Sequence, residues 1–146
     1  MLGLIQRVTE AKVEVANEMI GNIGPGILLL LGIEKEDSQA TADKLLQKIL
    51  AYRIFSDAEG KMNLSVTDTH GGLLIVSQFT LAADTDKGLR PSFSSAKPPA
   101  EAELLYNYFI EQAKAVHAEV ACGSFGADMK VGLVNDGPVT FLLSSS

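Results

Sequence analysis

The residues Ile27 to Ile33, which read ILLLLGI, form the longest apolar run in the chain. This run is far shorter than the roughly 18 residues that a membrane-spanning helix needs. Gly24-Pro25-Gly26 precedes it and indicates a turn, because no Lys-Ser or Lys-Thr pair and no helical pattern follows, as a phosphate-binding loop would require. A short run of Ile and Leu bounded by turn residues is typical of a strand buried on both faces. We therefore expect a sheet that is covered on both sides.

Other segments carry β-branched residues in partial alternation, which is the pattern of half-buried strands. Asn17-Glu18 is the predicted turn of a hairpin near the start of the chain, and Asn135 to Pro138 is the predicted turn between the last two strands. The predicted strands, besides the apolar run, are Leu2 to Thr9, Lys12 to Ala16, Met19 to Ile23, Leu73 to Val76, Met129 to Val134 and Val139 to Leu143.

Two stretches show the helical spacing of apolar residues. Asp37 or Ser38 can cap the first helix, which is expected to run to about Phe55 and to close with a turn at Asp57 to Gly60. Pro98-Pro99 starts the second helix, which is expected to reach about Ala118. The predicted inward positions are Ala42, Leu45, Leu46, Ile49 and Tyr52 in the first helix, and Leu105, Tyr108, Phe109, Gln112, Ala113 and Val116 in the second.

These elements predict an α+β fold, with a mostly antiparallel, curled or barrel-like sheet and two covering helices. A chain of 146 residues is of ordinary size for one domain with one core. The sequence contains no internal repeat, linker or low-complexity tract. We therefore expect residues 1-146 to form a single domain.

The composition, 47% hydrophobic and 21% charged, is that of a globular protein. Cys122 is the only cysteine, so an intramolecular disulfide is impossible, and Met1 to Arg7 does not form a signal peptide. We expect a cytoplasmic protein with no membrane partner. The net charge of −6 argues against a general nucleic-acid binder, so an RNA partner would have to be held over a small area by local basic groups.

Several kinds of active site are unsupported by the residues available. His70, His117 and Cys122 are too few to build a zinc site, and no Gly-x-Ser-x-Gly motif or dinucleotide-binding unit is present. His70 precedes two glycines and is expected in a turn, whereas His117 is expected on the surface at the end of the second helix. We therefore expect neither a metal nor a cofactor.

Two segments combine polar side chains with the ends of strands. Ser77 to Leu81 could orient a polar substrate and present backbone N–H groups to an oxyanion, although a strand emerging into solvent would also have this composition. Asn135 to Thr140 could hold rigid carbonyl groups at Gly137-Pro138, although a hairpin turn is the simpler interpretation. The polar stretch from Ala83 to Lys97 is long for a connection, which favours a functional role. These patterns alone identify no reaction.

Taken in order, however, these segments resemble the motifs of the D-aminoacyl-tRNA deacylases of the bacterial-type D-Tyr-tRNA deacylase family. The resemblance extends over essentially the whole chain. It is carried by Leu4 to Val8, Tyr52 to Asn63, Ser77 to Asp84, Arg90 to Phe93 and Val134 to Phe141.

The resemblance implies a homodimer with its active sites at the subunit interface and the 3′ end of a tRNA carrying a D-amino acid as the partner. One subunit would supply the catalytic pocket, and the other would insert a Gly-Pro pair joined by a cis bond. The implied site residues are Ser77, Gln78, Phe79 and Thr80 in the pocket, Gly137 and Pro138 in the inserted loop, Arg7 as the anchor of that loop, and Phe125 and Met129 at the terminal adenine.

The implied function is proofreading by hydrolysis of the ester that joins a D-amino acid to tRNA. Gly137-Pro138 would exclude an L-side chain sterically, and glycine would partly escape this filter. Backbone groups and the 2′-hydroxyl of the terminal ribose would carry much of the chemistry, with Thr80 as a positioning residue, since no base stands beside it in the sequence. The alternatives are an esterase or amidase for small D-configured substrates and a non-catalytic RNA-end binder.

Overall fold

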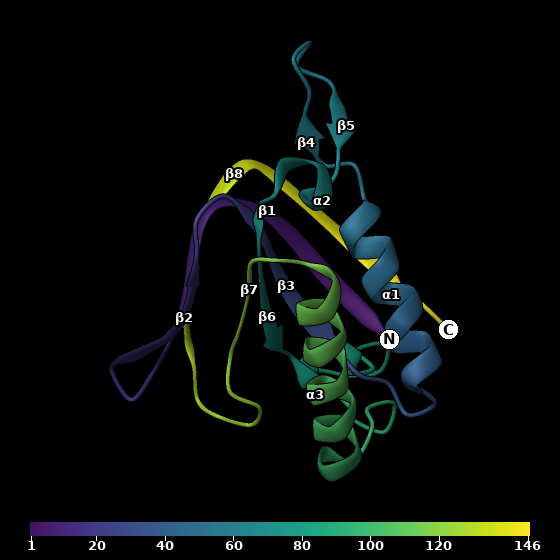
Figure 1. The fold of residues 1–146 in the computed structure, drawn as a ribbon. Coiled ribbons are helices and arrows are strands. Elements are labelled where there is room, and N and C mark those ends of the chain that lie inside the picture. Colours follow the sequence, from purple (N-terminus) through teal and green to yellow (C-terminus); the bar gives the residue numbers. More distant parts are fainter.

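The structure is a computed structural model that describes residues 1–146, and Figure 1 shows its curved sheet with α1 and α3 alongside. No helix combines the length and the apolar character that crossing a membrane demands. In chain order the elements are β1 (Leu2–Val15), β2 (Glu18–Ile23), β3 (Gly26–Gly32), α1 (Gln39–Ala51), β4 (Phe55–Ser56), β5 (Met62–Leu64), α2 (Val66–Thr69), β6 (Gly72–Ser77), the 3-10 helix η1 (Phe79–Ala82), α3 (Pro99–Val116), β7 (Val120–Cys122) and β8 (Lys130–Ser144).

Strand β1 organises the main sheet. It pairs antiparallel with β3 and β2 along one side and with β8 along the other. Strands β3, β6 and β7 are parallel neighbours, because α1 and α3 lie in the long connections that parallel strands need. The predicted α+β fold with a curled sheet is confirmed, and the one-turn helix α2 adds to the two predicted helices.

The sheet curls until its outer strands approach each other. Strand β2 pairs with the second half of β1 and lies against β7. A Cβ atom on Gly21 in β2 would stand only 3.0 Å from the carbonyl oxygen of Cys122 in β7. The missing side chain at Gly21 therefore allows the two strands to meet, and the sheet forms a nearly closed barrel.

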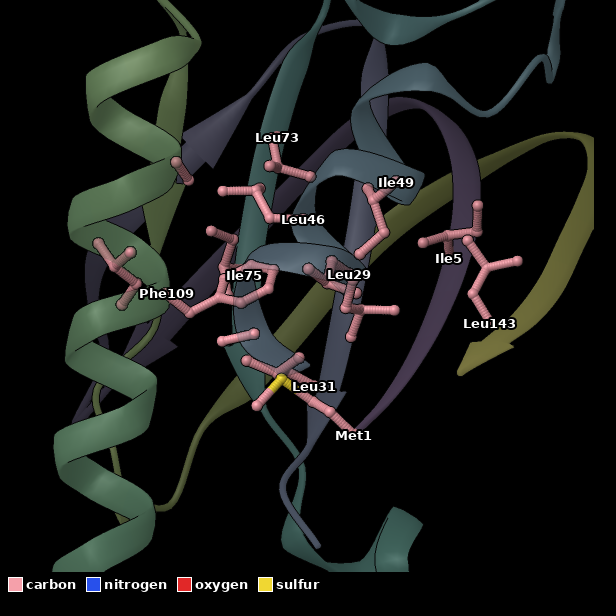
Figure 2. Close-up of a cluster of buried hydrophobic side chains, with 14 of the residues drawn as sticks. Met1, Ile5, Leu29, Leu31, Leu46, Ile49, Leu73, Ile75, Phe109 and Leu143 are labelled. Atoms are coloured by element: carbon pink, nitrogen blue, oxygen red, sulfur yellow. The ribbon is translucent and has the colours of Figure 1, made fainter. Parts of the chain in front are cut away.

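The central strands are buried on both faces. Leu29 and Leu31 of β3 belong to a large core beneath the helices, whereas Leu28 belongs to a smaller core on the opposite face. Strand β6 alternates in the same way, and the predicted two-sided burial is confirmed. Figure 2 shows the large core, where α1 contributes Leu46 and Ile49, α3 contributes Phe109, and the strands contribute Ile5, Leu29, Leu31, Leu73, Ile75 and Leu143.

Helix α1 ends at Ala51 rather than near Phe55 as predicted. Tyr52 adopts an extended backbone with ψ of 129°, and its ring packs edge-on against Phe141 of β8, with 5.5 Å between the ring centroids. The helical path of α1 therefore ends where the Tyr52 ring packs against the sheet. As a result, Asp57 to Gly60 form the tip of the β4–β5 hairpin and do not close α1.

Helix α3 covers the predicted residues, but its inward face differs from the predicted one. Its buried residues are Ala102, Tyr106, Phe109, Ile110 and Ala113, so only two of the predicted positions are fully buried. Val116 was predicted inward and is 66% exposed. Apolar residues occur around much of this helix, including Leu104, which is 72% exposed, and periodicity therefore could not select the face.

The prediction of two strands in place of β1, and of two in place of β8, is wrong. The partner of β1 jumps from Thr140, opposite Gln6, to Asn135, opposite Val8, so residues 136–139 bulge out of a ladder that then continues. The first hairpin turn is Ala16-Asn17, one residue earlier than predicted, with φ values of 50° and 66°. Strands β4, β5 and β7 are too short to give a periodic signal.

The two histidines differ in how well they were predicted. His70 ends α2 in a left-handed turn with φ of 56°, as expected of a turn residue. His117 is only 8% exposed, and its Nε2 lies 2.7 Å from the carbonyl oxygen of Gly71. The prediction of a surface histidine is wrong, because the end of α3 lies over the turn that precedes β6.

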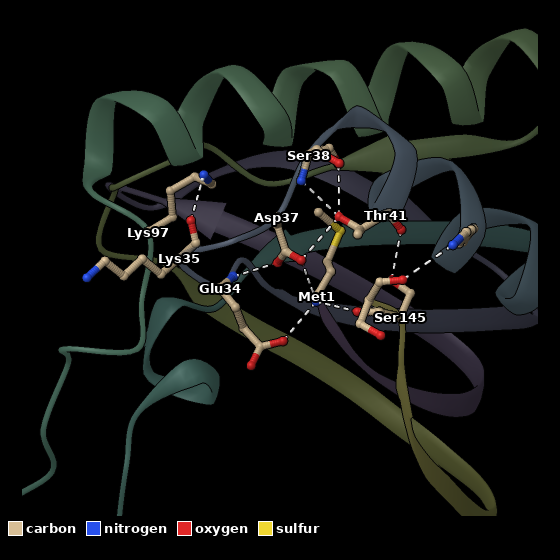
Figure 3. Close-up of polar contacts among 10 residues, drawn as sticks. Met1, Glu34, Lys35, Asp37, Ser38, Thr41, Lys97 and Ser145 are labelled. Carbon is tan, nitrogen blue, oxygen red and sulfur yellow. Dashed lines mark hydrogen bonds and ion pairs between the residues drawn. The ribbon is translucent and has the colours of Figure 1, made fainter.

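A buried ionic cluster fixes the edge of the fold at Met1 (Figure 3). The Met1 ammonium lies 2.7 Å from Asp37 Oδ1 and 2.8 Å from Glu34 Oε1, and it donates to the carbonyl oxygen of Ser145 at 2.8 Å. Asp37, 8% exposed, also accepts from the backbone N–H of Glu34 and from the Thr41 hydroxyl. The Met1 ammonium and the Asp37 carboxylate together thus connect the start of β1, the start of α1 and the chain after β8.

Replacing Asp37 with Asn should destabilise the protein, because the buried ammonium would lose its closest countercharge. We expect a loss of about 2–4 kcal/mol in the free energy of unfolding, measured by urea denaturation. Glu36→Gln is the matched control, because Glu36 is exposed and makes no ion pair. Equal stability of the two variants would contradict a structural role for this cluster.

Candidate active site

A cavity of about 740 Å³ opens where β6 ends. Residues from the ends of β3 and β6, from η1, from the loop between η1 and α3, from the start of α3 and from the segment before β8 form its walls. The lining residues are Leu31, Ile33, Val76, Ser77, Gln78, Phe79, Phe93, Ala96, Lys97, Pro98, Pro99, Ala102, Phe125, Gly126, Ala127, Met129 and Val131.

The predicted motif Ser77 to Thr80 lies at this opening. Ser77 ends β6, and the backbone N–H of Gln78 still donates to the Leu31 carbonyl oxygen of β3 at 2.8 Å. The chain then turns into η1, where the Gln78 side-chain amide donates to the Thr80 hydroxyl. Ser77, Gln78 and Phe79 line the cavity, whereas Thr80 is exposed beside it.

Two backbone N–H groups at the start of η1 take no part in the hydrogen bonds of that helix. The N–H groups of Phe79 and Thr80 precede the first hydrogen bonds of η1, in which the N–H groups of Leu81 and Ala83 donate to the carbonyl oxygens of Gln78 and Thr80. Neither the Phe79 nor the Thr80 N–H donates to a backbone carbonyl in a turn or loop. Two backbone N–H groups at the first turn of a helix thus lie next to the cavity, and a pair of such groups can stabilise an oxyanion.

Phe125 and Met129 also line the cavity, and a buried tyrosine supports that wall. The Tyr106 ring packs against Phe125 with 5.7 Å between centroids, and its hydroxyl lies 3.1 Å from the carbonyl oxygens of both Ile75 and Gly123. Burial raises the pKa of the Tyr106 phenol far above its ordinary value, so the hydroxyl remains a donor. Tyr106 was not predicted, because from the sequence it is one more aromatic residue on an amphipathic helix.

The loop between η1 and α3 contributes cavity residues that were not predicted as site residues. Phe93 lines the cavity and packs against Phe79 with 5.2 Å between ring centroids. Phe79 is 61% and Phe93 43% exposed, so both rings remain accessible. Lys97 lines the same cavity. The unusual length of the polar stretch Ala83 to Lys97 was the signal, but it could not indicate which of its residues face a cavity.

Gly137, Pro138 and Arg7 lie elsewhere in the chain and do not line this cavity. The Gly137-Pro138 peptide bond is cis, and residues 135–138 are exposed. Arg7 Nε donates to the Asp136 carbonyl oxygen at 2.9 Å, and Arg7 Nη1 donates to the Ile54 carbonyl oxygen at 2.7 Å. The guanidinium thus ties the bulge of β8 to the segment that follows α1.

Within one chain, the fold therefore brings together Ser77, Gln78, Phe79, Phe125 and Met129 and keeps Arg7 and the Gly-Pro pair apart from them. The cavity lining contains no carboxylate and no imidazole. Its one ionisable residue, Lys97, directs its Nζ to the Lys35 carbonyl oxygen. The groups present therefore suit binding and backbone stabilisation of charge.

Comparisons of the sequence identify the family. A model of the D-Tyr-tRNA(Tyr) deacylase family matches residues 4–144. The D-aminoacyl-tRNA deacylase of Stutzerimonas stutzeri is 66% identical over 145 residues, which are 99% of this chain and 100% of the relative. The D-aminoacyl-tRNA deacylase of Cellvibrio japonicus is 63% identical over 143 residues, which are 98% of each chain.

Solved structures share the fold. That of the c-Myc DNA Unwinding Element Binding Protein has a TM-score of 0.96 and 44% identity, and the match covers 100% of this chain and 99% of that one. The structure of a probable eukaryotic D-amino acid tRNA deacylase has a TM-score of 0.82 over 97% of each chain, and at 18% identity it supports the fold alone. With a family model spanning nearly all of its residues and relatives above 60% identity, this chain belongs to the D-Tyr-tRNA(Tyr) deacylase family.

Proposed function

We propose that the protein hydrolyses the ester bond of D-aminoacyl-tRNA and releases the free D-amino acid and the tRNA. The proposal rests on one observation above all. The strand-end motif Ser77 to Thr80 opens onto a cavity of about 740 Å³ in a chain that matches named deacylases over its full length. A cavity of this size suits an amino acid together with a nucleoside.

The complete site is proposed to form between two copies of the chain. The bulge of β8 is exposed and anchored by Arg7, yet it does not reach the cavity of its own chain. A second copy could supply it. Exposed apolar side chains near the bulge favour such an assembly, since Val134 is 48%, Phe141 38% and Leu142 58% exposed. In the dimer, Gly137 and Pro138 of one subunit would face Ser77 to Phe79 of the other.

Chiral selection is proposed to be steric. Carbonyl groups of the Gly137-Pro138 segment would accept hydrogen bonds from the substrate's α-ammonium group, and the ester carbonyl would face the free N–H groups of η1. A D-amino acid held at these two points directs its side chain out of the cavity. An L-amino acid held in the same way directs its side chain into the Gly-Pro backbone, which cannot yield while Arg7 holds it.

The chemistry proposed for this site needs no covalent intermediate. An aminoacyl ester is already activated, so a water molecule, the N–H groups of Phe79 and Thr80, and the substrate's own 2′-hydroxyl can together carry the reaction. Thr80 is exposed and accepts from the Gln78 side chain, and its hydroxyl makes no hydrogen bond to a carboxylate, an imidazole or an amine. We therefore assign Thr80 to positioning.

Substrate selection gives the first test of this function. If the Gly-Pro backbone excludes L-side chains, D-aminoacyl-tRNAs with very different side chains should be hydrolysed at similar rates. Glycyl-tRNA should be hydrolysed detectably and the L-forms negligibly. The measurement is the release of D-tyrosine, D-aspartate, glycine and L-tyrosine from their tRNAs at low enzyme concentration. Strong sorting of D-substrates by side-chain size would refute steric selection, and activity confined to free D-amino acid esters would favour the esterase alternative.

Mixing two inactive variants tests whether the site is shared. Gly137 has φ of 131°, and a Cβ atom there would lie 2.8 Å from Val139 Cγ2 and 3.2 Å from Arg7 Nη2, so Gly137→Ala should displace the bulge. Phe79→Glu should place a carboxylate in the cavity that repels the anionic RNA. The fold should stay intact, because Phe79 is largely exposed.

Each variant alone should lose most activity, and an equal mixture after exchange of subunits should recover about one quarter of the wild-type activity, because half of the dimers are mixed and each holds one intact site of two. Gly24→Ala, whose Cβ atom would meet nothing within 4 Å, is the control for a glycine replacement. Absence of recovery in dimers that do exchange would place both segments in the site of a single chain.

The role of Thr80 can be separated from nucleophilic catalysis. Thr80→Ala should keep kcat/KM within about ten-fold of wild type, which corresponds to about 1.4 kcal/mol. Loss of a covalent nucleophile would instead cost several orders of magnitude. Single-turnover deacylation of D-tyrosyl-tRNA is the measurement, and trapping of an acylated Thr80 in the wild type would overturn the assignment.

A further inference from the structure

One charged residue, Lys97, forms part of the wall of the cavity beside β6. Lys97 is the only ionisable residue among its lining residues, whereas the protein as a whole has 18 acidic and 12 basic residues and a net charge of −6. The rest of the lining is mainly apolar, with Ser77 and Gln78 as its polar members. In such surroundings a single ammonium group determines the sign of the charge that the cavity attracts.

Backbone contacts hold Lys97 in place. Its N–H donates to the Ile33 carbonyl oxygen at 3.1 Å, and its Nζ donates to the Lys35 carbonyl oxygen at 3.0 Å, a contact drawn in Figure 3. An ammonium group has three donors, so two remain for a ligand. No carboxylate pairs with Lys97. Glu34, which lies opposite Ala96 in an isolated β-bridge, is engaged by the Met1 ammonium, and Glu36 is exposed to solvent.

The chemistry of the proposed substrate identifies the anion. In an aminoacyl ester the carboxyl group is esterified and uncharged, and the α-amino group is positive. The phosphodiesters of the RNA are therefore the only anions that every such substrate carries. Lys97 would repel the α-ammonium group and attract the RNA, so its position favours one orientation of the substrate along the cavity.

We propose that Lys97 binds the phosphodiester on the 5′ side of the terminal nucleotide of the tRNA. This inference rests on the proposed function. Phe125 and Met129, the residues expected at the terminal adenine, line the same cavity. The accessible rings of Phe79 and Phe93 offer further faces there on which a nucleotide base can stack. A single well-placed cation together with aromatic surface is how an acidic protein can hold the end of an RNA over a small area.

The test compares two substrates, only one of which carries this phosphate. D-Tyrosyl-tRNA carries it, whereas 3′-O-(D-tyrosyl)adenosine has the same ester and base but no phosphodiester. In Lys97→Ala the loss of kcat/KM for the tRNA should exceed the loss for the nucleoside ester by about three- to ten-fold, as expected for one partly exposed charged contact. Lys97→Arg should recover most of the kcat/KM that Lys97→Ala loses on the tRNA, because arginine keeps the positive charge.

Salt dependence gives a second, independent readout. The slope of log(kcat/KM) against log[KCl] for the tRNA should become shallower by about 0.7 in Lys97→Ala, the value for one phosphate contact to a single strand. Lys114→Ala is the matched control, because Lys114 is an exposed lysine near the other end of α3, about 22 Å along the helix from its start beside the cavity. The control should leave both the substrate ratio and the slope unchanged.

Three results would overturn the proposal. Equal losses for the tRNA and the nucleoside ester would assign Lys97 to the aminoacyl end. An unchanged salt slope, or the same change in Lys114→Ala, would show that no phosphate is bound at Lys97. A wild-type protein without activity on D-tyrosyl-tRNA would instead refute the proposed function itself, so the two failures are distinguishable.

Discussion

The parallel pairing of β3 with β6 is the constraint on which the rest of the structure depends. Both strands are buried on both faces, so helices must cover one face and the curl of the sheet must close over the other. Leu31 of β3 pairs with Ser77 of β6, and β6 stops there. Polar groups that could not be buried within the strand therefore begin at the edge of the core, where the cavity opens.

The same architecture separates the two segments that the proposed function needs together. The motif at the end of β6 opens onto the cavity, whereas the Gly-Pro bulge interrupts the ladder between β1 and β8. Because β8 remains paired with β1 on both sides of the bulge, the bulge cannot move to the cavity of its own chain without breaking the sheet. The proposed site shared between two copies would account for both positions, and it would make catalysis depend on assembly.

Different parts of the cavity present different chemical groups. Backbone N–H groups lie at the η1 end, apolar and aromatic side chains form most of the wall, and one lysine stands at the loop before α3. This distribution suits a substrate that is polar at its ester, flat at its base and anionic in its backbone. It also explains how an acidic protein can act on RNA, since the favourable contacts are concentrated where the 3′ end would enter.

The sequence alone determined the α+β class, the two longer helices, the strand buried on both faces and the polar motif at the end of β6, because each of these depends on local pattern. It could not determine which side of α3 faces inward, that Tyr106 supports Phe125, that His117 is buried on Gly71, or that β8 continues past the Gly-Pro pair. Nor could it select Phe93 and Lys97 from a long polar loop. Those features were decided by the tertiary structure, because burial and contact between distant segments depend on how the whole sheet curls and on which surfaces it leaves available for packing.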